Sequence, residues 1–430
     1  MSRFKFVHAA DLHLDSGLTG LEEAAPEMAR AVREATLGAL ERIVRLCVEE
    51  EASFLVLAGD VWDEADRSLV AANRLRDALA ELARRGIPAF VASGNHDHEG
   101  GWRPRLEWPE TVRFFPPGSP ASYPVLREGR ELARVWGIGY PRREVRENYA
   151  RLLRRDRETP YAVAVLHANV GGQPGHDAYA PAGLEDLLAG GFDYWALGHV
   201  HNRLELRVAA PAIVYPGNTQ GRNPRELGPR GCYLVEVEGR ESRLRFVPTH
   251  GVEWRRLEVA IDGLEDEEAL QRALLWAVEE AAAELAGEGR GLIALLRLTG
   301  RGPLDASLRR PGLAGELLEE LRRRTGGRRP PVWIGRLERE TRPPRPLEQL
   351  AEEPSFEGEL ARITREALAG GGVAERFRRA LEPLYARGGL ARHLAPPDER
   401  LAGEELQEAL ALLLDLLEEE RARRAGGGAR

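Results

Sequence analysis

The stretch VASGNHDHEGG, residues 91–101, decides the architecture of the first half of the chain. An apolar run that begins at Ile87 leads into it, and an amide, an imidazole and a carboxylate then follow one another at positions 95–97. Three consecutive polar side chains that can bind a ligand or transfer a proton are unfavourable in a hydrophobic core. The pattern predicts a buried strand that ends in a turn at Gly94, with the polar residues at the strand end.

Strand-like and helical segments alternate around this stretch. The segments at 4–11, 52–60 and 87–94 are short and apolar. The second of them shows no polar alternation, so we expect it to be buried on both faces. Helical periodicity separates the three at 34–51 and 69–86. This βαβα order predicts a parallel sheet with crossover helices.

From about residue 111 the chain changes character. Short apolar runs follow one another with few long helices between them, and this spacing predicts a second sheet packed on the first. The runs lie at residues 134–141, 161–169, 192–201, 212–220 and 231–239.

The remainder of the chain divides again. After residue 250, three strand-like runs alternate with two strongly helical segments, which indicates a separate α/β unit. The proline-rich stretch TRPPRP at residues 341–346 predicts a linker, and the rest has helical periodicity. We therefore predict three domains, at residues 1–250, 251–342 and 343–430.

The bulk composition excludes several classes of protein. The chain has 430 residues, a net charge of -8 and 43% hydrophobic residues, which is typical of globular domains rather than disordered or basic nucleic-acid coat proteins. No apolar run approaches the about 20 residues of a membrane span. Because the N-terminus reaches a predicted strand at once, we expect no signal peptide. Cys47 and Cys232 form no ligand-spaced pair, so we expect reduced thiols in a cytoplasmic protein.

Polar side chains end five of the apolar runs. Because the carboxyl ends of successive parallel strands line one edge of a sheet, we expect these side chains to converge. Any one of them alone has an ordinary explanation, as a helix cap, a turn or a core histidine. Together, carboxylate, amide and imidazole groups without cysteine favour Mn, Fe or Zn over a thiolate zinc site. The residues are Asp11, His13, Asp60, Asp63, Asn95, His96, His167, His199 and His201.

These groups, in this order, resemble the calcineurin-like metallophosphoesterases. The resemblance covers about residues 1–250. Within the family it points to the nuclease subunit of the bacterial SbcCD complex, and it is strongest with the YhaO-type relatives of that subunit, which are described as DNA repair exonucleases. It implies an α/β fold, a four-layer α/β/β/α sandwich, followed by a small α/β cap domain and a helical C-terminus. The family pattern D-x-H, GD, GNH(D/E), H and GHxH is matched at residues 11–13, 59–60, 94–97, 167 and 198–201.

The resemblance implies a centre of two divalent metal ions, with Mn²⁺ in first place and Fe or Mg as alternatives. A bridging carboxylate can hold two cations roughly 3.5–4 Å apart, and the ions lower the pKa of a shared water so that hydroxide attacks phosphorus near neutral pH. A neutral amide ligand limits the negative charge that faces a phosphodiester. The implied ligands are Asp11, His13 and His201 for one ion, Asn95, His167 and His199 for the other, and Asp60 between them.

The resemblance also implies roles for residues beside the ligands. His96 would donate a proton to the leaving oxygen or a hydrogen bond to the phosphate. Asp63 would orient His96, and the alternative is that it caps the following helix. For substrate contacts we name Arg67, His176 and Arg222, and a solvated side chain is an equal alternative for the arginines.

We therefore expect a Mn-dependent phosphodiesterase that acts on DNA as the nuclease subunit of an SbcCD-like repair assembly. Its partners would be DNA and an SbcC-like coiled-coil ATPase, with a homodimer left open and no membrane. One alternative is a phosphodiesterase or phosphatase for a small substrate. The other is a non-catalytic scaffold in which the metal ions only hold the fold.

The last predicted helix has an apolar face. Leu406, Leu410, Leu413 and Leu417 recur at four-three-four spacing, which places them on one side of the helix. This face either packs on preceding helices of the same chain or docks the coiled coil of the ATPase. The sequence leaves both options open.

Overall fold

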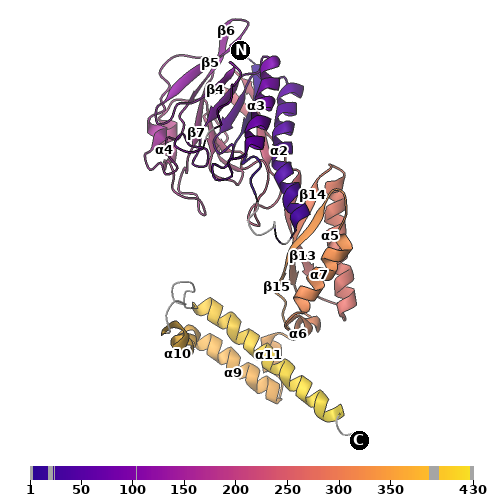
Figure 1. Ribbon diagram of the computed structural model, residues 1–430. Coiled ribbons are helices and arrows are strands. Elements are labelled where there is room, and N and C mark those ends of the chain that lie inside the picture. The colour runs from indigo at the N-terminus through magenta and orange to yellow at the C-terminus, as the bar shows by residue number, and fades with distance from the viewer. Residues whose placement is uncertain (1–2, 18–22, 24, 103, 387–396, 427–430) are drawn as a thin grey trace. The chain divides into compact units, whose positions relative to one another are not determined.

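The computed structural model describes residues 3–17, 23, 25–102, 104–386 and 397–426 (Figure 1). The chain forms two compact units. The first contains residues 1–255, 281–294 and 325–333, and the second contains 256–280, 295–324 and 334–430. The division into domains at residues 250 and 342 stays a prediction.

Three parallel strands form the middle of the first sheet. β1 (Arg3–Ala9), β2 (Leu55–Ala58) and β3 (Ala89–Ala92) pair in that order, and β2 and β3 are buried along their whole length. The helices α2 (Pro26–Glu49) and α3 (Leu69–Arg84) pack apolar side chains on one face of this sheet. The predicted βαβα order is confirmed.

The second sheet faces the first across a shared hydrophobic core. Aromatic and β-branched side chains of both sheets, among them Phe6, Phe54, Val163 and Tyr194, fill the space between them. The short helices η1 (Tyr149–Arg151) and α4 (Leu184–Leu188) pack on its outer face. The layers are α/β/β/α, as the sequence analysis expected. The sheet order is β5 (Ala121–Arg127), β6 (Arg130–Gly137), β7 (Ala162–His167), β8 (Tyr194–Gly198), β10 (Ala212–Tyr215) and β9 (Leu204–Arg207).

One apolar run belongs to a different sheet from the one predicted. Residues 231–239, expected in the second sheet, contain β11 (Gly231–Glu238), which pairs antiparallel with β1 of the first sheet. β12 (Glu241–Pro248) lies beyond it, and β4 (Val112–Phe114) forms the opposite edge. The first sheet is therefore mixed rather than purely parallel. An apolar run indicates burial but not its pairing partner, which explains the error.

The following segments form the predicted mixture of strands and helices. A three-stranded sheet has the order β13 (Val252–Ala260), β14 (Gly291–Thr299) and β15 (Val332–Arg339). The helices here are α5 (Glu267–Ala286), α6 (Leu304–Leu308) and α7 (Leu313–Thr325). The C-terminal helices are α8 (Leu347–Ala351), α9 (Phe356–Gly370), α10 (Val373–Ala386) and α11 (Glu399–Gly426).

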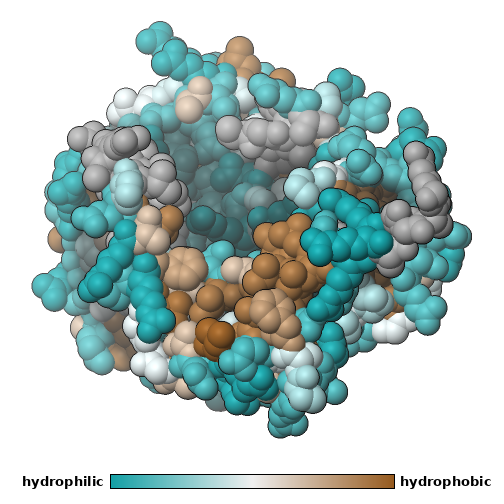
Figure 2. Space-filling view, turned by 90° about the horizontal axis from the view of Figure 1, so that it is seen from below, coloured by the Kyte–Doolittle hydropathy of each residue, from teal (hydrophilic) through white to brown (hydrophobic). Residues whose placement is uncertain are grey.

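The leucine face of α11 is split between two environments. Leu410 is buried against α8 and α9, and Leu406 packs beside Val373. Leu413, in contrast, is 42% exposed. Packing on the chain's own helices thus accounts for part of the predicted face, whereas Leu413 points outward and Leu417 is partly exposed. On the face shown in Figure 2, hydrophobic residues gather among hydrophilic ones.

Two further expectations concern the whole chain. Cys47 and Cys232 are free thiols with no solvent exposure. Among the described residues, none of the helices has both the length and the apolar character needed to span a membrane.

Candidate metal centre

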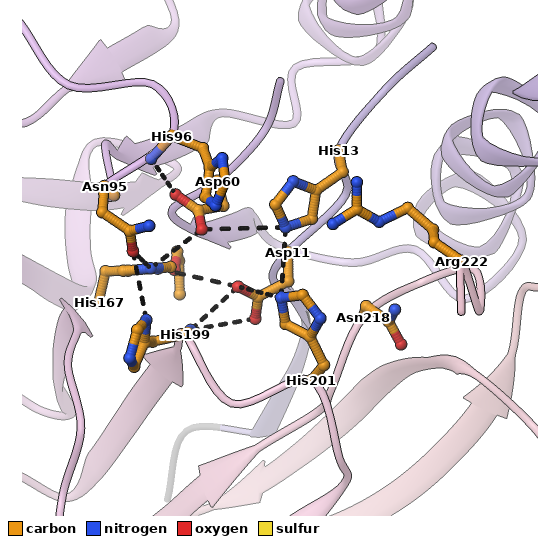
Figure 3. Close-up of polar contacts among 12 residues, drawn as sticks. Asp11, His13, Asp60, Asn95, His96, His167, His199, His201, Asn218 and Arg222 are labelled. Atoms are coloured by element: carbon orange, nitrogen blue, oxygen red, sulfur yellow. Dashed lines mark hydrogen bonds and ion pairs between the residues drawn. The ribbon is translucent and has the colours of Figure 1, made fainter. Parts of the chain in front are cut away.

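The candidate residues lie where strands of both sheets end (Figure 3). Asp11, Asp60 and Asn95 come shortly after the parallel strands β1, β2 and β3 of the first sheet. His167 is the last residue of β7, and His199 directly follows β8 in the second sheet. Because the two sheets are stacked face to face, segments from five distant parts of the sequence meet at this edge.

The backbone at these strand ends has an unusual conformation. Asp11, Asp60 and His199 have φ angles of 51°, 50° and 95°, a region that residues with a side chain seldom occupy. Such conformations cost on the order of 1–3 kcal/mol each and cluster at functional sites. Gly59 is also required here, because a Cβ at this position would lie 2.3 Å from Nδ1 of His167.

The first set of ligand atoms surrounds a common point. The Nε2 atoms of His13 and His201 lie 3.3 Å apart. Nε2 of His13 is 3.8 Å from Oδ2 of Asp60, and Nε2 of His201 is 4.0 Å from Oδ1 of Asp11. An ion bound at about 2.0–2.2 Å from each nitrogen and oxygen would fit between ligand atoms at these separations.

The second set adjoins the first. Oδ1 of Asn95 lies 3.0 Å from Nε2 of His167 and 3.2 Å from Nδ1 of His199. Nε2 of His167 is 3.3 Å from Oδ2 of Asp60, so the same carboxylate oxygen faces both sets. The structure therefore brings together all seven residues that the resemblance implied as ligands.

The outer ring nitrogen of each histidine ligand has a hydrogen-bond acceptor. These bonds fix the ring orientation and leave the lone pair of the inner nitrogen for a cation. In particular, the inner Nε2 atoms of His13 and His201 face each other at 3.3 Å, as two nitrogen ligands of one metal ion would. The acceptors are Asp63 Oδ1 for His13 (2.9 Å), Ala58 O for His167 (2.9 Å), Asp177 O for His199 (2.8 Å) and Glu226 Oε1 for His201 (2.7 Å).

Burial and charge set the protonation of these groups. Burial lowers the pKa of His13 to about 4 and that of His199 to about 3, so both rings are neutral at pH 7, as metal ligands must be. Burial also acts on His167, but the adjacent Asp60 and Asp11 carboxylates raise its pKa to about 9. A cation would compete with that proton, so metal binding should release it.

His96 is held beside the ligands without being one of them. Its Nδ1 lies 2.7 Å from Oδ1 of Asp63, the same oxygen that accepts from His13. Burial lowers the pKa of His96, but the hydrogen bond to Asp63 and the nearby Asp60 raise it overall. The His96 side chain is 36% exposed, so an incoming substrate can reach it. The cap of α3 is Ser68, not Asp63.

The three residues named for substrate contact are placed differently. His176 lies over the centre, with its ring centroid 5.6 Å from those of both His199 and His201. Nη1 of Arg222 is bonded to Asp63 Oδ2 at 3.1 Å and to the hydroxyl of Ser16. Arg67 is exposed, and among the described residues it makes no contact with the ligands.

Glu226, which holds His201, was not predicted from the sequence. It lies 25 residues beyond His201, inside the loop between β10 and β11 and not directly at a strand end. A lone acidic residue in such a loop is the only sequence signal. Asp97 has a related supporting role, because it accepts from the backbone N–H groups of Asp60, Val61 and Gly94 and so braces two of the loops.

Comparison with known proteins agrees with this geometry. Residues 4–203 match the family model of the calcineurin-like phosphoesterases, and residues 254–342 match that of the middle domain of metallophosphoesterase YhaO. The uncharacterized metallophosphoesterase YhaO of Bacillus subtilis is 36% identical over 384 residues, which cover 89% of this chain and 91% of that protein.

Two further proteins match more weakly. The DNA double-strand break repair protein Mre11 of Thermoplasma acidophilum is 25% identical over 260 residues, covering 56% of this chain and 64% of that protein. The SbcD component of the nuclease SbcCD of Bacillus subtilis is 23% identical over 257 residues, covering 52% of this chain and 63% of that protein. The motifs, the fold and the relative at 36% identity agree, and the chain belongs to the calcineurin-like metallophosphoesterases.

Proposed function

We propose that this protein is a metal-dependent phosphodiesterase that cleaves DNA, with Mn²⁺ as its metal. The observation that carries the proposal is the shared Oδ2 of Asp60, which faces two complete sets of ligand atoms. The similarity to a double-strand break repair protein and to a nuclease component supports DNA as the substrate.

The chain's own residues suit hydrolysis of a phosphodiester. Two divalent ions, when bound, would supply an activated water and positive charge for the phosphate oxygens. Asn95 contributes a neutral ligand, so the centre keeps a net attraction for an anionic substrate. His96, with its raised pKa, can give the proton on Nε2 to the leaving oxygen while Asp63 holds Nδ1.

A purely structural metal site would not need this last feature. A partly exposed imidazole that is held by a largely buried carboxylate has no evident use in stabilising the fold. His176, whose ring centroid is 5.6 Å from those of His199 and His201, adds a second partly exposed imidazole beside both ligand sets. We therefore favour catalysis over a scaffold role, and we assign His176 and Arg222 to the substrate side of the centre.

The test is hydrolysis by the purified protein with Mn²⁺. Labelled single- and double-stranded DNA should be offered beside a small chromogenic diester, with a chelator as the negative control. Cleavage of DNA that needs metal supports the proposal. Turnover of the small diester with no cleavage of either DNA would instead favour the small-substrate alternative.

We also propose that the outward side of α11 binds a coiled-coil ATPase of the SbcC kind. Leu412, Leu413 and Leu416 are 49%, 42% and 54% exposed there. Leucines exposed in a row on one helix are typical of helix-in-groove contacts. The choice of an ATPase rests on the family resemblance.

A further inference from the structure

Glu226 is a buried carboxylate on which four donors converge. Its residue exposure is 4%. Oε1 accepts from Nδ1 of His201 at 2.7 Å and from Nδ2 of Asn223 at 2.6 Å. Oε2 accepts from Nδ2 of Asn218 at 2.7 Å and from the backbone N–H of Arg222 at 2.6 Å. The two amide NH2 groups and the backbone N–H can only donate, so each oxygen of Glu226 must act as an acceptor.

The ionised carboxylate decides which nitrogen of His201 carries the proton. A carboxylate without a proton only accepts, so Nδ1 of His201 must donate to it. Nε2 then keeps its lone pair, and it points to where Nε2 of His13 and Oδ1 of Asp11 also point. Without Glu226 the ring would be free to change its tautomer or rotate, and the ligand atom would be lost.

Glu226 also anchors the loop that carries Arg222. The backbone of Arg222 is tied to Glu226, and its guanidinium reaches Oδ2 of Asp63. Asp63 in turn holds His13 and His96 through its other oxygen. One buried carboxylate thus supports a ligand directly and, through Arg222, the second histidine of the same ligand set.

We propose that Glu226 is a positioning residue that selectively sets the affinity of the metal site formed by Asp11, His13 and His201. This inference rests on the two-metal function proposed above. The outer nitrogens of His167 and His199 are held by backbone carbonyl oxygens instead. A change at Glu226 should therefore weaken one ion and spare the other.

The decisive variant is Glu226→Gln in the full-length protein. It keeps the shape of the side chain. In either orientation of the new amide, however, its NH2 group replaces an oxygen that accepts from two N–H donors. The metal-free protein is titrated with Mn²⁺. Calorimetry measures the affinity of each of the two sites, and electron paramagnetic resonance detects the coupled ion pair. We expect one ion to bind with unchanged affinity, the other to bind about 10–100-fold more weakly, and the coupled signal to be lost at limiting Mn²⁺.

The chain offers a matched control in Glu253→Gln. Glu253 is 3% exposed, and its Oε2 lies 2.8 Å from Nε2 of His250, so it forms another buried carboxylate–imidazole pair. Neither residue touches a metal ligand. This variant should bind both ions with the affinity of the wild type. If it loses the same ion as Glu226→Gln, general loosening explains the effect and the inference is overturned.

The remaining outcomes are distinct. Two ions bound with unchanged affinity in Glu226→Gln would overturn the role of Glu226 while leaving the two-metal proposal intact. A wild-type protein that binds no ion pair would overturn the proposed function itself. If Glu226→Gln does not fold, Glu226→Asp, which keeps the charge but shortens the reach, should show the same selective loss, and unchanged affinity there would likewise refute the role.

Discussion

The two sets of metal ligands differ in what holds their histidines. In the set that contains Asn95, both imidazoles donate to backbone carbonyl oxygens, those of Ala58 and Asp177. In the other set both donate to side-chain carboxylates, Asp63 and Glu226. A backbone acceptor is fixed by the fold and cannot be removed by substitution. A carboxylate adds negative charge, makes the imidazole a stronger ligand and can be lost in one mutation.

Asp60→Asn should have the largest effect on hydrolysis, because it changes both sets of metal ligands at once. Oδ2 of Asp60 faces His13 on one side and His167 on the other, and an amide there is a weaker ligand without charge. We expect hydrolysis to be abolished and the affinity for both ions to fall. Metal content and turnover should be measured on the same sample.

The control for this variant is Asp193→Asn, another buried carboxylate that bonds only backbone and arginine groups away from the centre. It should retain both ions and full turnover. Full activity with a wild-type metal load in Asp60→Asn would contradict the assignment of the bridging ligand.

The comparison also shows what the sequence could and could not predict. The residues of both ligand sets were predictable, because each ends or follows an apolar run and parallel strands bring such ends to one edge. The backbone acceptors follow from the same fold. Glu226 was not predictable, because its contact with His201 depends on how an irregular loop folds. The pairing of β11 with β1 was missed for a similar reason, since apolar character does not specify a neighbour.

His96→Ala should have the next largest effect on hydrolysis, and it should leave both sets of metal ligands intact. The side chain is not a ligand, so both ions should bind with unchanged affinity. If His96 protonates the leaving oxygen, the rate should fall roughly 10²–10⁴-fold. A diester with a very good leaving group needs less protonation and should lose less. Equal losses for good and poor leaving groups would indicate positioning instead of acid catalysis.

Asp63→Asn should affect both the ligand set that contains His13 and the proton donor His96. Asp63 helps to raise the pKa of His96, so its loss should lower that pKa. His96 would then lose its proton at a lower pH. The alkaline limb of the pH–rate profile should therefore move to lower pH. We expect a rate loss of about 10–100-fold and weaker binding of the ion at His13. An unchanged profile with normal metal binding would show that Asp63 holds neither histidine in solution.

The smallest effect on hydrolysis is expected from changes in the C-terminal helices, which belong to the other compact unit. In the double variant Leu413→Glu with Leu416→Glu, charge is placed on the outward side of α11, while Leu410 keeps its contacts inside the helices. Hydrolysis of a small diester and the binding of both ions should be unchanged. Capture of the SbcC-like ATPase from the same organism should be lost, because buried charge at an apolar contact costs more than the contact provides.

The matched surface control is Leu126→Glu on β5, a leucine that is 60% exposed outside the C-terminal helices. It should leave both activities unchanged. If the double variant still captures the ATPase with unchanged affinity, the outward leucines are not the docking surface. If the double variant instead loses turnover of the small diester or a metal ion, α11 supports the catalytic centre. The metal centre at the strand ends and the helical docking region would then not be independent of each other.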